Sequence, residues 1–384
     1  MSESTSSGPV FVLNAGSSSL KYRLVDAATG ESSAAGTIER IGEQGSDVPD
    51  AGTAVRQALE QLREQAGVTP AVVGHRVVHG GDRFDAATVI DDSVEQAIDD
   101  LSALAPLHNP ANLAGIRAAR EALPDLPQVA VFDTAFHRTL PAAAATYAID
   151  ADLAARYGVR RYGFHGTSHR YVSRAAAAFL GRPVQATKLI VLHLGNGASA
   201  CAVDGGVSVE TSMGITPLEG LVMGTRSGDL DPAVLFHLHR QAGLGFDELE
   251  RMLNSGSGLK GLTGSGDMRD VRAAAAGGDI AARIALDTYA HRIRHYVGAY
   301  LAQLGALDAV VFTAGVGEND AATRAESLAG LEGLGIRVDP QRNAATATGA
   351  RRISPDRAPI AVLVVPTDEE LEIARQSVAA VAAA

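Results

Sequence analysis

A strand, a turn rich in glycine and hydroxyl residues and a second strand occur together twice in this chain. The two copies lie at 12–19 and 191–199, so that Gly16 and Gly195 are separated by nearly half of the 384 residues. Glycine permits a close backbone approach, and free amides and hydroxyls direct hydrogen-bond donors toward anionic oxygens. The repeat therefore predicts a duplicated pair of domains, each of which offers one phosphate-binding turn to a shared nucleotide cleft.

The residues that follow the first turn distinguish it from the common P-loop. Leu20, Tyr22 and Leu24 alternate with other residues, which predicts a continuing strand and a β-hairpin, whereas the P-loop G-x-x-x-x-G-K-S/T opens a helix. Lys21 adds a positive charge beside the turn. A single turn of this kind is more often an ordinary structural hairpin, but two at matching positions favour phosphate binding.

The composition excludes several classes of function. With 46% hydrophobic and 20% charged residues, the chain is typical of a globular protein with an ample core. A formal net charge of −11 and the lack of any lysine–arginine run argue against nucleic acid or an anionic membrane as a partner. The sequence contains no apolar run long enough to span a bilayer. We therefore expect neither nucleic acid nor a membrane among the partners.

The single cysteine and the N-terminal residues indicate the compartment. Cys201 cannot form an intramolecular disulfide, is compatible with a reducing cytoplasm, and is expected to be a small buried residue after the second turn. Residues 1–8 are polar and serine-rich without a basic stretch and an apolar core, which predicts a short flexible lead and no signal peptide. We expect a cytoplasmic protein.

Alanine-rich segments with helical periodicity alternate along the chain with short apolar runs. The segments predict packing helices at 51–65, 174–180 and 280–304. The apolar runs predict strands at 11–13, 71–78, 129–132, 189–194, 309–313 and 360–365. The alternation predicts an α/β architecture, in which ligands bind at the ends of strands.

Two isolated arginines are candidate anion ligands. Arg76 stands in a predicted strand among apolar residues, although a solvated guanidinium on a surface strand is an alternative. The spacing of His75 and His79 can suggest zinc, but the valines favour a strand and the glutamate of the H-E-x-x-H motif is missing. Arg226 lies beside glycines, and its alternative is a simple ion pair with Asp229.

An acid and a histidine are candidate catalytic groups. Asp133 follows the predicted strand at 129–132 and suits helix capping and catalysis equally well. His165 lies beside glycines and hydroxyls, which suits donation toward developing negative charge, although a turn histidine bonded to a backbone carbonyl is the simpler interpretation. Glycine turns at 264–270 and 312–319 carry charges of both signs and suit a ribose and an adenine better than a phosphate.

Eight motifs carry a resemblance to a known family, and they occur in the family's order. They are NAGSSSLK, GHRVVHGG, VFDTAFH, GFHGTSH, HLGNGAS, MGTRSGD, GVGEN and TDEEL. From Val10 to the C-terminal helix, the chain resembles the acetate kinase family, within the superfamily whose fold is similar to actin and the sugar kinases. The resemblance implies an α/β fold of two duplicated actin-like (ribonuclease H-like) domains with an interdomain nucleotide cleft.

The resemblance also implies how the chain divides. An N-terminal actin-like domain, residues 1–135 plus 370–384, would carry the substrate and metal side. Residues 136–369 would form a C-terminal actin-like domain that binds the nucleotide and supplies most of a homodimer interface.

The activity implied by the resemblance is a reversible, Mg²⁺-dependent transfer of the γ-phosphoryl group of ATP to acetate, which gives acetyl phosphate and ADP. Mn²⁺ is an alternative metal. The acceptor is already a carboxylate at neutral pH and needs no general base. We therefore expect direct in-line transfer, with Asp133 orienting Asn14, a metal-bound water or an arginine. The alternatives are a propionate or butyrate kinase and a non-catalytic actin-like nucleotide-binding module, which would tolerate loss of Arg76, Arg226 and His165.

The resemblance assigns the site residues through their motifs. The catalytic set would be Arg76, which would also hold the substrate carboxylate, with Asp133, His165 and Arg226. The small apolar pocket for the acyl methyl group would be formed by Val78, Leu107, Phe164 and Pro217. The residues expected to contact ATP or ADP are Ser17, Ser19, Lys21, His193, Leu194, Gly195, Asn196, Gly197, Asp267, Met268, Arg269, Gly315, Val316, Gly317, Glu318 and Asn319.

Two oxygen ligands, Asn14 and Glu369, would hold the magnesium directly or through water. Such a site, with few protein ligands, is typical of kinases, where the phosphates supply the rest. This chain departs from the family pattern at Asp368, where relatives often carry asparagine. The departure leaves open which of Asp368, Glu369 and Glu370 meets the metal.

Overall fold

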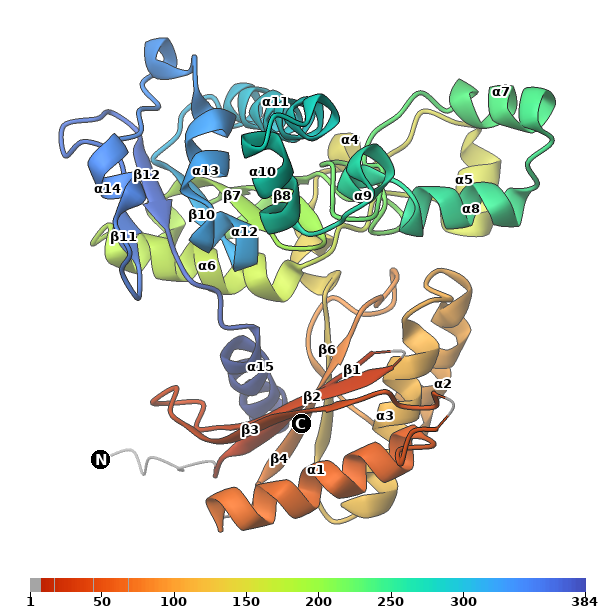
Figure 1. Ribbon diagram of the computed structural model, residues 1–384. Helices are drawn as coiled ribbons and strands as arrows, with labels where there is room; N and C mark the ends of the chain where they lie inside the picture. Colours follow the sequence, from red (N-terminus) through yellow and green to blue (C-terminus); the bar gives the residue numbers. More distant parts are fainter. Residues whose placement is uncertain (1–7, 17, 44, 68) are drawn as a thin grey trace. The chain divides into compact units, whose positions relative to one another are not determined.

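The structure, a computed structural model, describes residues 8–16, 18–43, 45–67 and 69–384 (Figure 1). The expected flexible lead lies outside the described residues except for Gly8, and so does Ser17, one of the expected nucleotide contacts. The chain divides into two units. Unit 1 comprises the described residues of Met1–Arg138, Gly166–Ser168 and Asp368–Ala384, and unit 2 those of Thr139–His165 and His169–Thr367.

Unit 1 contains a mixed six-stranded sheet in the order β3-β2-β1-β4-β6-β5. The first three strands form an antiparallel meander, β4 and β6 add parallel to β1, and β5 is antiparallel to β6 at the edge. Because β1 and β2 pair directly, the first glycine turn closes the β-hairpin expected from the alternating residues. The strands are β1 (Val10–Ala15), β2 (Ser19–Val25), β3 (Ser32–Glu39), β4 (Val72–Val77), β5 (Thr88–Val89) and β6 (Gln128–Phe132).

Unit 2 repeats this arrangement strand for strand. Read from the corresponding edge, its order is β9-β8-β7-β10-β12-β11. Its first three strands form an antiparallel meander, β10 and β12 add parallel to β7, and β11 is antiparallel to β12 at the edge. The two sheets share strand order and direction, so the duplication predicted from the two glycine turns is confirmed. The strands are β7 (Lys188–Leu194), β8 (Ala198–Asp204), β9 (Val207–Thr211), β10 (Ala309–Thr313), β11 (Arg351–Arg352) and β12 (Ala361–Val364).

Helices cover both faces of the unit 1 sheet. On one face, α1 (Ala51–Ala66) and α3 (Asn109–Ala122) contribute to a core cluster that includes Val73 of β4. On β4, a Cβ on the next residue, Gly74, would lie only 2.6 Å from Ser377 Oγ of α15 (Glu369–Ala383). Successive strand residues point to opposite faces, so α15 covers the face opposite α1. The remaining α-helix of unit 1 is α2 (Asp92–Asp100).

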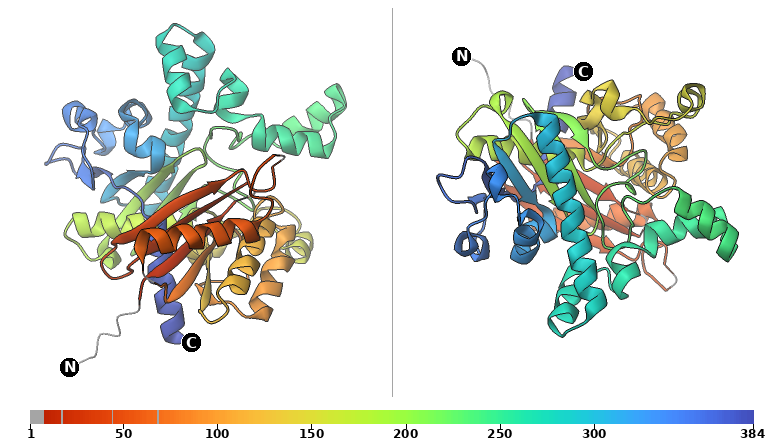
Figure 2. Two further views of the ribbon diagram at one scale, coloured as in Figure 1. Left: turned by 60° about the horizontal axis from the view of Figure 1, so that its bottom comes forward. Right: turned by 90° about the horizontal axis from the view of Figure 1, so that it is seen from above.

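In unit 2, the long helix α11 (Ile280–Leu304) packs against β7 and β8 and runs across the sheet in the right-hand view of Figure 2. The short helix α12 (Ala314–Asn319) follows β10 and packs against β7 and β10, while α10 (Met268–Ala276) and α13 (Ala321–Leu328) contact α11. The other α-helices are α4 (Ala142–Ala145), α5 (Ala151–Tyr157), α6 (Gly166–Phe179), α7 (Ala233–Ala242), α8 (Phe246–Ser255), α9 (Gly258–Thr263) and α14 (Pro340–Ala344).

The expected strands and helices are present, but one expected boundary is wrong. The helix expected at 174–180 is only the end of α6, which begins at Gly166. The sequence pattern misses this start because residues 167–169 are polar by type, although all of them are buried. Cys201 is fully buried on β8, as expected. Among the described residues, none of the helices has the length and apolar character that crossing a bilayer requires.

Candidate active site

Arg76 and Asp133 form an ion pair at the ends of two neighbouring strands of unit 1. β4 and β6 run parallel with Arg76 opposite Val131, and Asp133 follows directly after β6. Arg76 Nε lies 3.1 Å from each carboxylate oxygen of Asp133, and Nη2 lies 2.7 Å from Oδ2. The Asp133 side chain is 1% exposed and that of Arg76 20% exposed. The alternative of a solvated surface guanidinium is therefore wrong, and Asp133 commits its carboxylate to the ion pair.

Glu369 adds a second buried acid beside this ion pair. Burial alone would lower the pKa of the Arg76 guanidinium, but the charges of Asp133 and Glu369 raise it above its usual value. Burial raises the pKa of the Glu369 carboxyl, and so do Asp133 and Glu370, although Arg76 opposes them. Glu369 Oε1 is buried and has no hydrogen-bond partner within the described part of the chain. This corner of unit 1 therefore has an excess of negative charge that a cation would relieve.

Asp368 differs from its neighbour Glu369 in having partners already. Its Oδ1 accepts a hydrogen bond from Leu371 N at 3.0 Å, which caps α15, and binds Arg23 Nη1 of β2 at 2.7 Å. Of these two adjacent acids, Glu369 is thus the one whose buried oxygen lacks a partner among the described residues.

The first glycine turn lies at the end of the β1–β2 hairpin. Gly16 N donates to Ser19 O at 2.7 Å, which closes the turn. Asn14 on β1 is directly opposite Lys21 on β2, so their side chains leave the same face of the sheet. Ser19 is half-buried and Lys21 is exposed. The hairpin therefore presents an amide and a cation side by side.

The two histidines near Arg76 have structural partners. His75 Nε2 lies 2.7 Å from Gln128 Oε1, and burial lowers the pKa of His75 to about 4. His79 Nδ1 accepts a hydrogen bond from Gly81 N at 3.0 Å. The described residues include no group of three or more histidine, cysteine, aspartate or glutamate side chains that could hold a metal ion. Any metal here would thus rely on fewer side chains and on ligands from outside the chain.

Arg226 of unit 2 has no carboxylate partner among the described residues. Its Nη1 donates to Pro217 O at 2.7 Å, and burial lowers the pKa of its guanidinium. Asp229, the alternative partner, accepts hydrogen bonds from Gly220 N and from Tyr296 Oη, each at 2.8 Å. The alternative of an Arg226–Asp229 ion pair is therefore wrong, and the charge of Arg226 is available to an anion.

His165 lies beside Arg226 and the second glycine turn. Its backbone is left-handed, with a φ of 56°, a conformation that is uncommon for non-glycine residues. Its Nδ1 lies 2.9 Å from Ser199 Oγ, a side-chain hydroxyl, and its ring stacks on His193 with 4.2 Å between centroids. A Cβ on Gly197 would meet Arg226 at 3.4 Å and the His165 ring at 3.5 Å. The turn therefore lies within van der Waals distance of both side chains.

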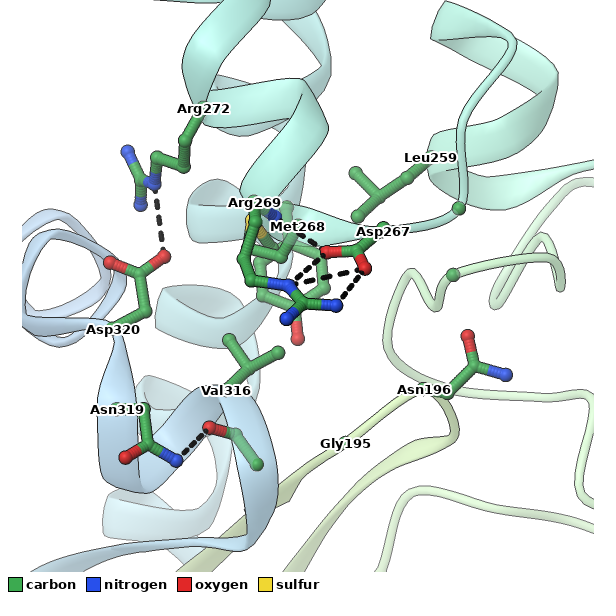
Figure 3. Close-up of a pocket in the computed structure, with 14 residues that line it drawn as sticks. Gly195, Asn196, Leu259, Asp267, Met268, Arg269, Arg272, Val316, Asn319 and Asp320 are labelled. Atoms are coloured by element: carbon green, nitrogen blue, oxygen red, sulfur yellow. Dashed lines mark hydrogen bonds and ion pairs between the residues drawn. The ribbon is translucent and has the colours of Figure 1, made fainter.

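A cavity of about 910 Å³ opens in unit 2 beside the same turn (Figure 3). Its walls come from the β7–β8 turn, from the start of α10 and from α12. In Figure 3, Arg269 folds back onto Asp267, with 3.0 Å between Nε and Oδ1, and Arg272 binds Asp320 at 2.9 Å. The expected nucleotide residues that line the cavity are Gly195, Asn196, Asp267, Met268, Arg269, Gly315, Val316 and Asn319.

Other expected nucleotide contacts lie elsewhere. Ser19 and Lys21 belong to unit 1. Glu318 Oε1 accepts hydrogen bonds from Ala314 N at 2.8 Å and from Thr367 N at 3.3 Å, so it braces the left-handed start of α12. The expected unit 2 contacts that do not appear among the lining residues of the described cavity are His193, Leu194, Gly197, Gly317 and Glu318.

The cavity also has lining residues outside the expected nucleotide contacts, namely Gly224, Leu259, Arg272, Tyr289 and Asp320, together with Gly266 of the glycine turn expected at 264–270. The two glycines carry a sequence signal, because Gly224 lies in the motif MGTRSGD and Gly266 in the glycine turn at 264–270. A Cβ on Gly224 would lie 2.1 Å from Asn196 Oδ1 and 2.9 Å from Gly266 O, so the backbones approach closely there. The others lie on or next to helices, and which side of a helix faces a cavity depends on packing.

The four residues expected to form the acyl pocket are divided between the units. Val78 and Leu107 belong to unit 1, and Phe164 and Pro217 to unit 2. Leu107 is 59% exposed, whereas Phe164 is buried. The carbonyl of Pro217 accepts the hydrogen bond from Arg226. Their common pocket stays a prediction.

Comparison with known proteins identifies the family. A model of the Acetokinase family matches residues 9–375. The acetate kinase of Leifsonia xyli subsp. xyli is 62% identical over 393 residues, which cover 97% of this chain and 99% of the relative. The crystal structure of Porphyromonas gingivalis acetate kinase has a TM-score of 0.93 at 40% identity and covers 97% of this chain and 100% of its own. A propionate kinase from Francisella tularensis subsp. tularensis SCHU S4 has a TM-score of 0.91 at 40% identity, with coverage of 97% and 99%.

These matches extend over almost the whole chain, and both kinds of comparison, of sequence and of structure, agree on a kinase. The chain therefore belongs to the acetokinase family and is a phosphotransferase enzyme.

Proposed function

We propose that this enzyme transfers the γ-phosphoryl group of ATP reversibly to acetate and gives acetyl phosphate and ADP. The observation that carries the proposal is the Arg226 guanidinium, which lies against the second glycine turn without a carboxylate partner among the described residues. A partly buried cation in that position requires an anion. The relatives named acetate kinase in sequence and structure support acetate as the acceptor.

The nucleotide would occupy the large cavity of unit 2. Its volume of about 910 Å³ falls within the range of small-molecule sites. Backbone groups of the β7–β8 turn would face the phosphates, and the segments at the start of α10 and in α12 would hold the ribose and adenine. Arg226 and His165, which lie beside the turn, would stabilise the negative charge of the phosphoryl group in the transition state.

The acceptor carboxylate would bind to Arg76. The hydrogen bonds to Asp133 use Nε and Nη2, which leaves Nη1 of the guanidinium for a substrate. Asp133 would act as a positioning residue, because its two oxygens hold the guanidinium plane in one orientation. This role requires no proton transfer, in keeping with an acceptor that is already deprotonated.

Asn14 and Glu369 fit the ligands of a Mg²⁺ ion, with Mn²⁺ as an alternative. The fit rests on the buried Glu369 Oε1 that has no hydrogen-bond partner among the described residues, and on the excess negative charge around it. An amide oxygen, a carboxylate and nucleotide phosphates together make the oxygen-rich site that Mg²⁺ prefers. When bound, the ion neutralises phosphate charge. Asp368 is the weaker candidate ligand because Leu371 N and Arg23 already occupy it.

In the transfer itself, an acetate oxygen attacks the γ-phosphorus in line with the bond to the β-phosphate. The new bond forms between that oxygen and phosphorus as the bond to ADP breaks, and the electron pair leaves with ADP. Alignment and positive charge are what such a loose transition state mainly needs. Accumulation of a phosphorylated enzyme on the reaction path would rule out this direct route.

A hydroxamate assay for acyl phosphate tests the activity. The purified protein with ATP, Mg²⁺ and acetate should form acetyl hydroxamate, and Arg226→Gln should lower kcat by about 100- to 1,000-fold, as loss of a transition-state donor does. Wild-type protein that hydrolyses or binds ATP without forming acyl phosphate would instead be a non-catalytic nucleotide-binding module.

The preference for acetate is tested by kcat/KM values for acetate, propionate and butyrate. The test matters because the propionate kinase is as similar in sequence as one of the solved acetate kinases. One methylene in an apolar pocket changes the barrier by only about 1–3 kcal/mol. We expect acetate to have the highest kcat/KM, and a higher value for propionate would change the assigned substrate.

We further propose a cytoplasmic homodimer whose interface comes mostly from unit 2. Large apolar side chains are exposed on α7 and α8 of that unit, with Phe236 58% and Phe246 86% exposed. Exposed apolar groups of this kind are typical of protein–protein contacts. One chain has a mass of 39.6 kDa, and analytical ultracentrifugation should give twice that mass. A monomer at micromolar concentration would contradict the proposal.

A further inference from the structure

A second cavity of unit 2, of about 500 Å³, lies on α12, α13 and α14 and on the loop that leads to β11. It shares Asn319 with the large cavity but has a different set of side chains. Its polar lining residues are Glu318, Asn319, Arg324, Asn343, Thr346, Thr348 and Arg351. None of its residues other than Glu318 and Asn319 belongs to the site described above.

Arg324 is a buried cation whose partners are all uncharged. It is 2% exposed, and its Nε donates to Asn343 Oδ1 at 2.7 Å. Its Nη1 donates to the carbonyl oxygens of Gly317 and Glu318, both at 2.9 Å, and its Nη2 to Asn343 O at 2.8 Å. These contacts satisfy hydrogen bonds but do not neutralise the charge.

Arg351 places a second positive charge at the same cavity. Its Nη1 and Nη2 donate to the carbonyl oxygens of Ala347 and Glu318 at 3.2 and 3.3 Å. Its Nε is buried without a hydrogen-bond partner among the described residues. Burial, and then the charge of Arg351, lower the pKa of Arg324 to about 10, against a smaller opposing effect of Asp320.

The two acids nearest along the chain are engaged elsewhere. Glu318 Oε1 accepts from Ala314 N, and Asp320 binds Arg272 at 2.9 Å. No carboxylate of the described residues forms an ion pair with Arg324 or Arg351. The two guanidiniums therefore share one cavity, where they repel each other and where an anion would lower that repulsion.

We infer that this second cavity is an anion-binding site, separate from the nucleotide cavity, that takes a small, multiply charged oxyanion. Arginine recognises phosphate and carboxylate groups alike, and the threonine hydroxyls and asparagine amides add neutral donors. A cavity of about 500 Å³ has room for a phosphate or for a small organic dianion. Both arginines also donate to the carbonyl oxygen of Glu318, so the site would be connected to α12 through hydrogen bonds.

The test is a calorimetric titration of the full chain with inorganic phosphate, at ionic strength held constant with sodium chloride. The variant Arg351→Gln removes one guanidinium while leaving the buried contacts of Arg324 in place. Its matched control is Arg352→Gln, because the adjacent residue of β11 points to the opposite face of the strand and binds Asp356 O at 3.2 Å. Thermal unfolding of all three proteins first establishes that each is folded.

We expect wild type and Arg352→Gln to bind phosphate alike and Arg351→Gln to bind at least about 10-fold more weakly at one site, as loss of a charged donor does. Equal binding by wild type and Arg351→Gln, or an equal loss in Arg352→Gln, overturns the inference. The comparison also separates this site from any phosphate bound near Arg226, since that binding would be unchanged in both variants.

Succinate distinguishes the two sources of oxyanion. If succinate displaces phosphate from wild type but not from Arg351→Gln, the site accepts dicarboxylates. If succinate does not displace the bound phosphate, the site is a phosphate site. The inference does not rest on the proposed acetate kinase activity. A protein inactive in the hydroxamate assay would contradict the proposed acetate kinase activity. The same result would not change the interpretation of the phosphate titration.

Discussion

The carboxylate of Asp133 is bound by the side chain of Arg76. The carboxylate is 1% exposed, and both of its oxygens bind the guanidinium. A buried ion of this kind is stable only while its counter-ion keeps the right geometry. A substitution at Asp133 should therefore change the orientation of the Arg76 guanidinium, including the Nη1 that is proposed to bind the substrate.

Asp133→Asn should lower kcat for acetyl phosphate formation by about 100-fold or more, because the amide keeps the shape but removes the charge that holds the Arg76 guanidinium in place. The measurement is kcat and the KM for acetate over a range of Mg²⁺ concentrations. The control is Asp125→Asn, an identical change at an exposed position before β6, which should have no effect. Near-normal turnover with an unchanged Mg²⁺ dependence would show that Asp133 has no positioning role.

Glu369 gives a prediction about pH. Its pKa is raised above the ordinary value of 4.5 by burial and by Asp133 and Glu370, so in that pH range the folded state binds more protons than the unfolded state. The free energy of unfolding therefore falls as the pH rises from about 4.5 through the folded-state pKa. Without metal, Glu369→Gln should be more stable than wild type at about pH 8, and the difference should vanish toward pH 4.5.

Thermal unfolding over that pH range, with and without Mg²⁺ and ADP, provides the measurement. Ligand should raise the Tm of wild type more than that of Glu369→Gln, because the variant lacks the proposed metal ligand. Glu121→Gln, at an exposed position on α3, is the control and should follow wild type. A Glu369→Gln variant that is less stable than wild type at every pH would contradict the inference that the ionised Glu369 carboxylate destabilises the folded state.

Among the elements, the turns hold the candidate nucleotide site together. Gly224 N donates to Asn196 O at 3.0 Å, which ties the loop that carries Arg226 to the β7–β8 turn. On the other side, Glu318 holds the left-handed residue Ala314 at the start of α12. These two hydrogen bonds help to fix the positions of the cavity walls.

Gly224→Ala should weaken ADP binding by about 10-fold, because its Cβ would lie 2.9 Å from Gly266 O and the backbone would have to shift. Isothermal titration with ADP measures the effect. Gly298→Ala in α11 is the control, since its Cβ meets nothing within 4 Å. That variant should bind ADP normally and gain about 0.5–1 kcal/mol in stability from the better helix former. Normal ADP affinity in Gly224→Ala would show that the close approach is not needed.

At the level of the whole molecule, each unit has its own six-stranded sheet, and the large cavity lies within unit 2 alone. ADP without Mg²⁺ or acetate should therefore slow hydrogen exchange mainly in unit 2, in the β7–β8 turn, at the start of α10 and in α12. Exchange measured by mass spectrometry, with sodium chloride at equal ionic strength as the control, tests this expectation. Slower exchange confined to the β1–β2 hairpin of unit 1 would place the nucleotide elsewhere.

Local sequence patterns predicted part of the secondary structure and the duplication. Alternating residues around each glycine turn specify a hairpin, and apolar runs specify buried strands, because both signals depend on neighbours close along the chain. Motif order was enough to predict the family, which the comparisons confirm. The start of α6 was missed because burial, which polar residue types do not reveal, decides it.

Which charges are paired depends on tertiary contacts that the sequence patterns do not show. Arg76 meets Asp133 because β4 and β6 are neighbours in the sheet, and Asp368 is occupied because Arg23 reaches it from β2. Arg226 and Asp229 are close in sequence yet bind different partners. The two arginines of the second cavity carry no motif at all. Ion pairs and cavities join residues that are distant along the chain, so strand order and helix packing determine them, and no local pattern records either.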